Sequence, residues 1–293
     1  MRRNARARGR GAGRPSAAHW GMATSPPRQP EHPEAPHPSA PSSPLSPEPE
    51  PVTRTAPRPV RPILLAQGWL DLTFLHWPVE PALVAPLLPP GTVPDTIDGV
   101  TYVGLVPFRM DRISLGPRPA IPYFGSFAET NVRLYSVDRA GRRGVVFRSL
   151  EAARLLPVAV ARAAFALPYM WARMRVERLG TAEHPEFRYT TVRRAPGPRG
   201  AGGSVHIRVG PPYEADELAD FLTARWGLHV AWHGRTLYLP NEHPPWPLRH
   251  AELLAWEDDL LVGAGLPPVS GPPVSVLFSP GVRTRFGPPL RCP

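Results

Sequence analysis

Residues 127–152 read FAETNVRLYSVDRAGRRGVVFRSLEA, and this stretch predicts a β-hairpin. Its two arms, residues 127–137 and 144–152, are rich in the β-branched and aromatic residues that favour strands. The polar segment between them, from Asp138 to Gly141, is typical of a tight turn. A hairpin this long pairs antiparallel strands and favours a sheet built by consecutive connections.

The first arm carries four polar side chains on one face. Side chains alternate along a strand, so one side presents Glu129, Asn131, Arg133 and Tyr135. Inside a barrel, such a carboxylate and guanidinium would orient a small acidic ligand. The alternative is a solvated face with an ion pair, because antiparallel sheets often wet one side. Candidates to join the row from neighbouring strands, with ordinary surface positions as the alternative, are Arg109, Arg148 and Glu151.

Short strand-like segments continue on both sides of the hairpin. Further strands are expected at 69–77, 101–110, 169–177, 186–194, 204–209, 228–232, 236–239, 248–256 and 274–278. Helices are expected at 80–88, 153–167, 214–226 and briefly at 258–264. Pro107 indicates an edge or a bulge within its strand. Many strands and few helices predict an α+β fold, mainly an antiparallel barrel or a sandwich with peripheral helices.

The composition excludes several chemistries. All 34 basic residues are arginine, which removes a Schiff base, a phosphate-loop lysine and a Ser-Lys dyad. The single cysteine, Cys292, rules out a disulfide scaffold and multi-cysteine zinc sites. His229 and His233 share a face of an expected strand, but no acidic ligand stands at a fixed spacing nearby. We therefore expect no metal and no cofactor.

Charge and proline divide the chain at about residue 62. Residues 1–62 hold 10 arginines and four acidic residues, so +6 of the net charge of +10 lies there, with 15 of the 44 prolines. We expect this tail to be disordered and residues 63–293 to form a single domain.

The tail also bears on partners and location. An arginine arm would touch nucleic acid through counterion release. The favoured alternative is a solvated tail, or sequence upstream of a true start at Met22. No apolar run of 18 residues follows position 62, so we expect no membrane span and a cytoplasmic protein. The oligomeric state is not predicted.

Six strings of the body together resemble the YqjF-like family, domain of unknown function 2071, of the acetoacetate-decarboxylase-like superfamily. They are FLHW at 74–77, VGLVPFRM at 103–110, ETNVR at 129–133, VFRSLEA at 146–152, LPY at 167–169 and HPPWPL at 243–248. The similarity runs in order from about residue 69 to 278. It implies a single antiparallel β-barrel or cone with helices outside.

The sequence departs from one feature that the resemblance implies. The superfamily's decarboxylases form a Schiff base on a lysine that directly follows a proline. Here Pro168 is followed by Tyr169, and no lysine exists elsewhere. Glu129 resembles a pocket glutamate of these enzymes. The implied ligand is a small organic acid or carbonyl compound, handled without an imine.

In an enzyme of this kind, Glu129 would act as general acid or base and Tyr169 would polarise a carbonyl oxygen. Arg133 would hold a carboxylate. The candidate ligand-binding set also includes Asn131, Arg109, Glu151 and His76. A buried core tyrosine is the alternative for Tyr169. A non-catalytic ligand-binding or structural module is the alternative function.

Overall fold

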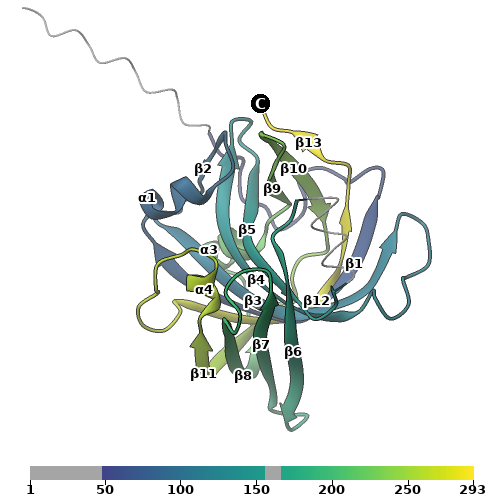
Figure 1. The fold of residues 1–293 in the computed structure, drawn as a ribbon, viewed down its shortest axis with the longest axis vertical. Helices are drawn as coiled ribbons and strands as arrows, with labels where there is room; N and C mark the ends of the chain where they lie inside the picture. The colour runs from purple at the N-terminus through teal and green to yellow at the C-terminus, as the bar shows by residue number, and fades with distance from the viewer. Residues whose placement is uncertain (1–47, 156–165) are drawn as a thin grey trace, which may run out of the picture. The chain divides into compact units, whose positions relative to one another are not determined.

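The computed structural model describes residues 48–155 and 166–293, which consist mainly of β-strands (Figure 1). The strands are β1 (Leu65–Val79), β2 (Thr92–Pro94), β3 (Thr101–Leu115), β4 (Phe127–Asp138), β5 (Arg143–Ala152), β6 (Tyr169–Gly180), β7 (Pro185–Ala195), β8 (Gly202–Pro212), β9 (Gly227–Trp232), β10 (Arg235–Glu242), β11 (Arg249–Asp258), β12 (Ser275–Phe286) and β13 (Leu290–Arg291). The expected hairpin is confirmed as β4 and β5, which pair antiparallel.

The helices are short. They are α1 (Pro81–Val84), the 3₁₀ turn η1 (Ala85–Leu87), α3 (Glu217–Thr223) and α4 (Leu260–Gly263). Asp216 begins α3 by accepting a hydrogen bond from the backbone N–H of Ala219 at 2.7 Å. The helix expected at 153–167 falls mostly outside the described residues. No helix in the described part is long and apolar enough to cross a membrane.

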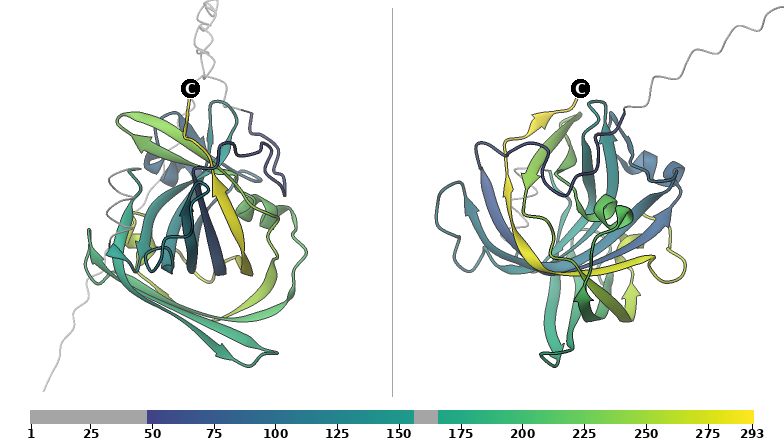
Figure 2. Two further views of the ribbon diagram at one scale, coloured as in Figure 1. Left: turned by 90° about the vertical axis from the view of Figure 1, so that its right-hand side faces the viewer. Right: turned by 180° about the vertical axis from the view of Figure 1, so that it is seen from behind.

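The strands close into two rings that share a wall. Pairing runs β1–β3–β4–β5–β6–β7–β8–β11–β12 and back to β1, which gives a nine-stranded ring, called here the large ring. Because β9 also pairs with β5 and β10 with β12, a second circuit, called here the small ring, joins β5–β9–β10–β12–β1–β3–β4. Figure 2 shows β6, β7 and β8 curving away from the shared strands.

The shared wall explains the burial of its central strands on both faces. Residues 101–108 of β3 and 129–138 of β4 are buried without alternation. On β4, Val132 and Leu134 pack in the large ring against Phe187 and Ile207. The opposite face of β4 turns into the small ring, where Tyr135 packs with residues of α3. Both faces of the wall therefore face protein.

Two details of the sheet differ from or refine the sequence expectations. The barrel is mixed rather than purely antiparallel, because β5 pairs parallel with both β6 and β9. Pro107 lies in an interior strand, opposite the point where the β1–β3 ladder breaks between Leu70 and Leu75. A proline, which has no N–H to donate, fits such a break.

Residues 48–62 pack against the barrel, which differs from the expected disorder of that part. Val60 is 3% exposed, and its N–H donates to the carboxylate of Glu242 at 2.9 Å. The Thr53 carbonyl accepts a hydrogen bond from the Trp226 indole at 2.9 Å. Residues 1–47, with the arginine arm, lie outside the described residues.

Candidate functional site

The polar row on β4 lies inside the small ring. Glu129, Asn131, Arg133 and Tyr135 are between 0 and 9% exposed. A solvated sheet face is therefore wrong for this row. The small ring places the row against β1, β3 and α3, which come from separate parts of the sequence.

Glu129 is paired with Tyr169 at one end of the row. The Tyr169 hydroxyl donates to Glu129 Oε2 at 3.1 Å, from the first residue of β6, which pairs with the end of β5. Burial raises the pKa of Glu129 to about 8, against the opposing effect of the Tyr169 hydrogen bond. Burial, together with Glu129, also raises the pKa of Tyr169. At neutral pH this pair is a neutral acid beside a phenol.

Arg133 lies at the other end of the row in a polar network. Its Nε donates to the Tyr135 hydroxyl and its Nη2 to the Leu222 carbonyl, both at 3.1 Å. The guanidinium also lies 5.4 Å from the centre of the Phe74 ring. His76 Nε2 is 2.7 Å from the Tyr135 hydroxyl. The network ties β4 to β1 and to α3.

The charge of Arg133 has no carboxylate partner among the described residues. The two other buried arginines each have one: Arg193 pairs with Glu151 and Arg225 with Asp95. A buried guanidinium is costly unless a counter-charge accompanies it. Arg133 is therefore the buried arginine of the described residues that lacks a carboxylate partner.

Two polar atoms near Arg133 also have unused hydrogen-bonding capacity. His76 Nδ1 and Asn131 Oδ1 are buried and have no hydrogen-bond partner among the described residues. Burial, followed by the charges of Arg133 and Arg225, holds the pKa of His76 well below its usual value, so the ring is neutral. Buried polar groups in folded proteins nearly always have a partner. These two atoms therefore leave unused hydrogen-bonding capacity beside the middle of the row.

The structure separates the remaining candidates from this row. Glu151 faces the large ring, where it binds Arg193 and accepts a hydrogen bond from Ser149 at 3.1 Å. Arg109 has a side chain that is 51% exposed and paired with Asp71. Half-buried Arg148 donates to the Leu87 carbonyl at 3.0 Å. The structure thus places Glu151 on the opposite face of the wall from Glu129, and Arg109 and Arg148 bind other elements.

The expected pairing of two histidines on a strand face is also wrong. β9 ends at Trp232, and His233 occupies the following turn with a φ of 46°. His229 alone belongs to the strand and is buried. Its neighbours come from β4 and from the segment after β13.

Sequence reasoning missed the groups that come from distant segments. Asp95 and Arg225 form an ion pair beside Tyr135, with the Arg225 guanidinium 4.8 Å from the centre of that ring. Phe74 and Leu222 supply the surface and the carbonyl that hold Arg133. No spacing signal links these residues. The alternation of β4 itself indicated Tyr135.

Comparison with known proteins identifies relatives of the whole barrel. The family model DUF2071, described as an uncharacterized conserved protein, matches residues 66–283. The uncharacterized protein YqjF of Bacillus subtilis (strain 168) is 32% identical over 191 residues, which cover 64% of this chain and 76% of YqjF. Residues 66–283, which the family model matches, include both Glu129 and Arg133.

Solved structures share the fold at low identity. An acetoacetate decarboxylase-like enzyme from Sphingomonas wittichii RW1 superposes with a TM-score of 0.55 at 14% identity, covering 78% of this chain and 93% of that one. The enduracididine biosynthesis enzyme MppR, complexed with pyruvate, superposes with a TM-score of 0.53 at 14% identity, covering 86% and 93%. These similarities confirm the acetoacetate decarboxylase-like barrel.

Proposed function

The chain belongs to the DUF2071 family, and we propose that its small ring binds an organic acid and moves a proton at a carbonyl centre with Glu129. The observation that carries the proposal is that a buried guanidinium and a buried carboxyl lie on the same face of β4. Arg133 is a buried cation without a carboxylate partner in residues 48–155 and 166–293, and Glu129 is a buried carboxyl with a pKa of about 8. The carboxylate of an acidic ligand would neutralise the charge of Arg133, and the rest of the ligand would contact Glu129.

The spacing of the row sets the size of the ligand. Glu129 and Arg133 are four residues apart on β4, which separates their Cα atoms by about 13 Å. A molecule that reaches both is an extended acid whose carboxylate and carbonyl are several carbons apart. The pyruvate bound by MppR supports the acid class, whereas the strand spacing argues for a longer chain. Asn131 lies between the two ends, and its Oδ1 accepts no hydrogen bond from any described residue.

The chemistry follows from the two ends. With the ligand carboxylate on Arg133, ionised Glu129 removes a proton from the carbon next to the carbonyl. The C–H electron pair forms an enolate, and the Tyr169 hydroxyl donates a hydrogen bond to the enolate oxygen. Return of a proton from Glu129 to that carbon restores the ligand. Since the pKa of Glu129 is raised to about 8, the rate rises with pH until about 8.

Hydrogen–deuterium exchange tests the proposal without a known substrate. The full chain is incubated in D₂O with 5-oxohexanoate, and the loss of the proton signal next to the ketone is followed by NMR. We expect catalysed exchange by the wild type and its loss in Glu129→Gln. Tyr169→Phe is expected to lower the rate about 10²-fold, in line with the removal of one oxyanion donor.

A matched arginine pair separates binding from proton transfer. Arg133→Met is expected to raise the concentration needed for half-saturation, and Arg109→Met, at the exposed ion pair with Asp71, is expected to leave it unchanged. Equal exchange rates in wild type and Glu129→Gln contradict the catalytic role. Binding of the acid without any exchange supports the second candidate, a ligand-binding module that uses the same Arg133 anchor.

A further inference from the structure

A second group of chemically competent side chains lies away from the β4 row, where three distant segments meet. Asp138 ends β4, His229 is in β9, and Cys292 directly follows β13. Each offers one ligand atom, and these atoms all lie within 4.8 Å of one another. Asp138 and His229 are fully buried, and Cys292 is partly exposed.

The imidazole of His229 is held in a defined position. Ser136 Oγ lies 2.8 Å from Nδ1 and also donates to the Gly144 carbonyl at 3.4 Å. A Cβ on Gly144 would come within 2.8 Å of Nδ1, so glycine is needed for the ring to lie against β5. In the tautomer that carries its hydrogen on Nδ1, Nδ1–H donates to Ser136 Oγ, and the Ser136 hydrogen goes to the Gly144 carbonyl. Nε2 is then left with its lone pair.

That nitrogen faces a carboxylate oxygen. Nε2 is buried and has no hydrogen-bond partner among the described residues, and Asp138 Oδ2 is 3.5 Å away. In a tetrahedral zinc site with ligand distances of about 2.0–2.2 Å, nitrogen and oxygen ligands are about 3.3–3.5 Å apart. The observed separation suits two ligands of one ion.

A catalytic triad fits this geometry poorly. In a cysteine–histidine–carboxylate relay, the carboxylate accepts a hydrogen bond from the ring nitrogen that does not face the nucleophile. Here Ser136 occupies Nδ1, and Asp138 faces Nε2. The carboxylate is therefore placed as a ligand beside the histidine nitrogen.

We propose that Asp138, His229 and Cys292 bind a divalent metal ion of the zinc type. A thiolate, an imidazole and a carboxylate are donors that zinc accepts, and three protein ligands leave a fourth position. On binding, the Cys292 S–H proton passes to solvent and the sulfur lone pair forms the metal bond. Ser136 is the positioning residue that fixes the histidine ring.

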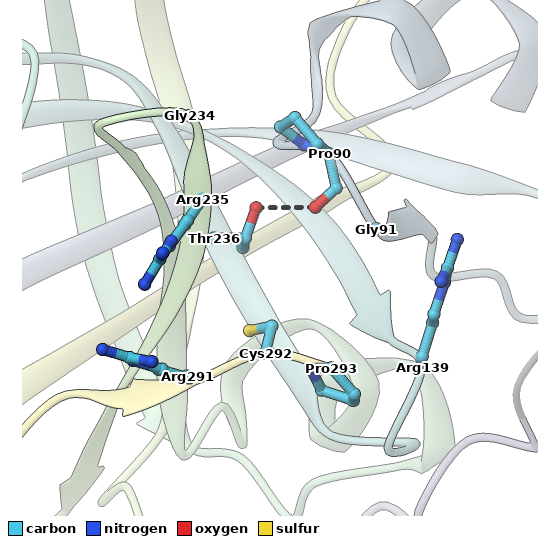
Figure 3. Close-up of a pocket in the computed structure, with 9 residues that line it drawn as sticks. All are labelled: Pro90, Gly91, Arg139, Gly234, Arg235, Thr236, Arg291, Cys292 and Pro293. Atoms are coloured by element: carbon cyan, nitrogen blue, oxygen red, sulfur yellow. Dashed lines mark hydrogen bonds between the residues drawn. The ribbon is translucent and has the colours of Figure 1, made fainter.

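The surroundings both support and constrain this site. Cys292 also lines a depression of about 270 Å³, which gives solvent a route to the sulfur (Figure 3). The backbone N–H of Cys292 donates to the Thr236 carbonyl at 3.0 Å and fixes the residue. Arg142 pairs with Asp138 Oδ2 at 2.6 Å, so one cation already contacts this carboxylate. The lining also includes Arg139, Arg235 and Arg291.

These positive charges oppose the binding of a cation, so binding depends entirely on the three proposed ligands. Burial raises the pKa of the Cys292 thiol to about 12. The metal must therefore displace a firmly held proton, and affinity is expected to rise with pH.

Cobalt substitution tests the proposal directly. The full chain is stripped with a chelator, titrated with Co²⁺, and followed by absorption. We expect a thiolate-to-cobalt charge-transfer band that saturates at one ion per chain and disappears when Zn²⁺ is added. Because the chain has one cysteine, any such band reports Cys292. Saturation at half an ion per chain indicates two cysteines from separate copies and overturns the proposal.

Variants complete the test. Cys292→Ser, at a partly exposed position that should not impair folding, is expected to abolish the band. His229→Gln is expected to weaken Co²⁺ binding at least 10-fold. His250→Gln, an exposed histidine outside the cluster, serves as the control and should bind as the wild type does. Absence of the band in the wild type, or equal Co²⁺ binding by Cys292→Ser and wild type, overturns the proposal and leaves His229 as a structural partner of Asp138.

Discussion

Glu129 couples the stability of the fold to pH. Its pKa is about 8 in the folded chain, against about 4.5 for an unperturbed glutamate. Between these values the folded state keeps a proton that the unfolded state releases. The unfolding free energy therefore falls as pH rises from about 5 to about 8, by up to about 1.4 kcal/mol per pH unit. Above pH 8 this contribution is constant.

The substitution Glu129→Gln removes the titrating carboxyl and nearly preserves the shape of the side chain. We expect the unfolding free energy to decrease less between pH 5 and pH 8 in the variant than in the wild type. Urea denaturation at pH 5, 6.5 and 8 measures both profiles. Subtracting the two profiles cancels other groups that titrate in this range, such as Asp258, whose pKa burial raises to about 6. Parallel profiles for the two proteins contradict a buried, protonated Glu129.

Arg133 and Arg193 differ in what their removal leaves behind. Arg193→Met strands Glu151 as a buried, unpaired carboxylate and should cost about 3–5 kcal/mol of unfolding free energy. Arg133→Met removes a cation that has no carboxylate partner among the described residues, so we expect a change within about 1 kcal/mol in ligand-free protein. Urea denaturation compares the two variants. A loss at Arg133 as large as at Arg193 would show that its charge is already compensated.

At the scale of elements, local patterns predicted the hairpin of β4 and β5 and most strand positions. Alternation correctly grouped Glu129, Asn131, Arg133 and Tyr135 on one face. It could not tell that both faces are buried, because closure of the second ring depends on distant pairs such as Val145 with Leu228. The same limit explains the misplacement of Glu151, which points into the large ring.

The segment before β1 acts as a strap on the barrel. Val60 is buried, the Glu50 N–H donates to the Gly141 carbonyl at 2.8 Å, and Arg54 pairs with Asp220 on α3. We expect a chain that starts at residue 63 to melt several degrees below one that starts at residue 48, because the longer chain keeps these contacts. Thermal unfolding of the two truncations measures the difference. Equal melting temperatures contradict a stabilising role for 48–62.

At the scale of the whole molecule, the described barrel holds two buried polar interiors divided by one wall. In the large ring, the buried charges of Glu151 and Arg193 neutralise each other in an ion pair. In the small ring, Arg133 has no carboxylate partner from the described part of the chain, and burial raises the pKa of Glu129 to about 8. The resemblance found in the sequence correctly placed the chain in its family and fold. The proposed metal ligands Asp138, His229 and Cys292 could not be grouped from the sequence, because they come from unrelated positions along the chain. The catalytic and ligand-binding roles of the row stay predictions.

Calorimetric titration of the full chain with 5-oxohexanoate tests the central claim that the small ring binds an extended acid through Arg133. The account predicts one site per chain, with affinity lost at least 10-fold in Arg133→Met and retained in Arg109→Met. It also predicts weaker binding of pyruvate, which cannot reach from Arg133 to Glu129. Equal affinity of wild type and Arg133→Met for the acid, or loss of affinity in both arginine variants alike, would contradict it.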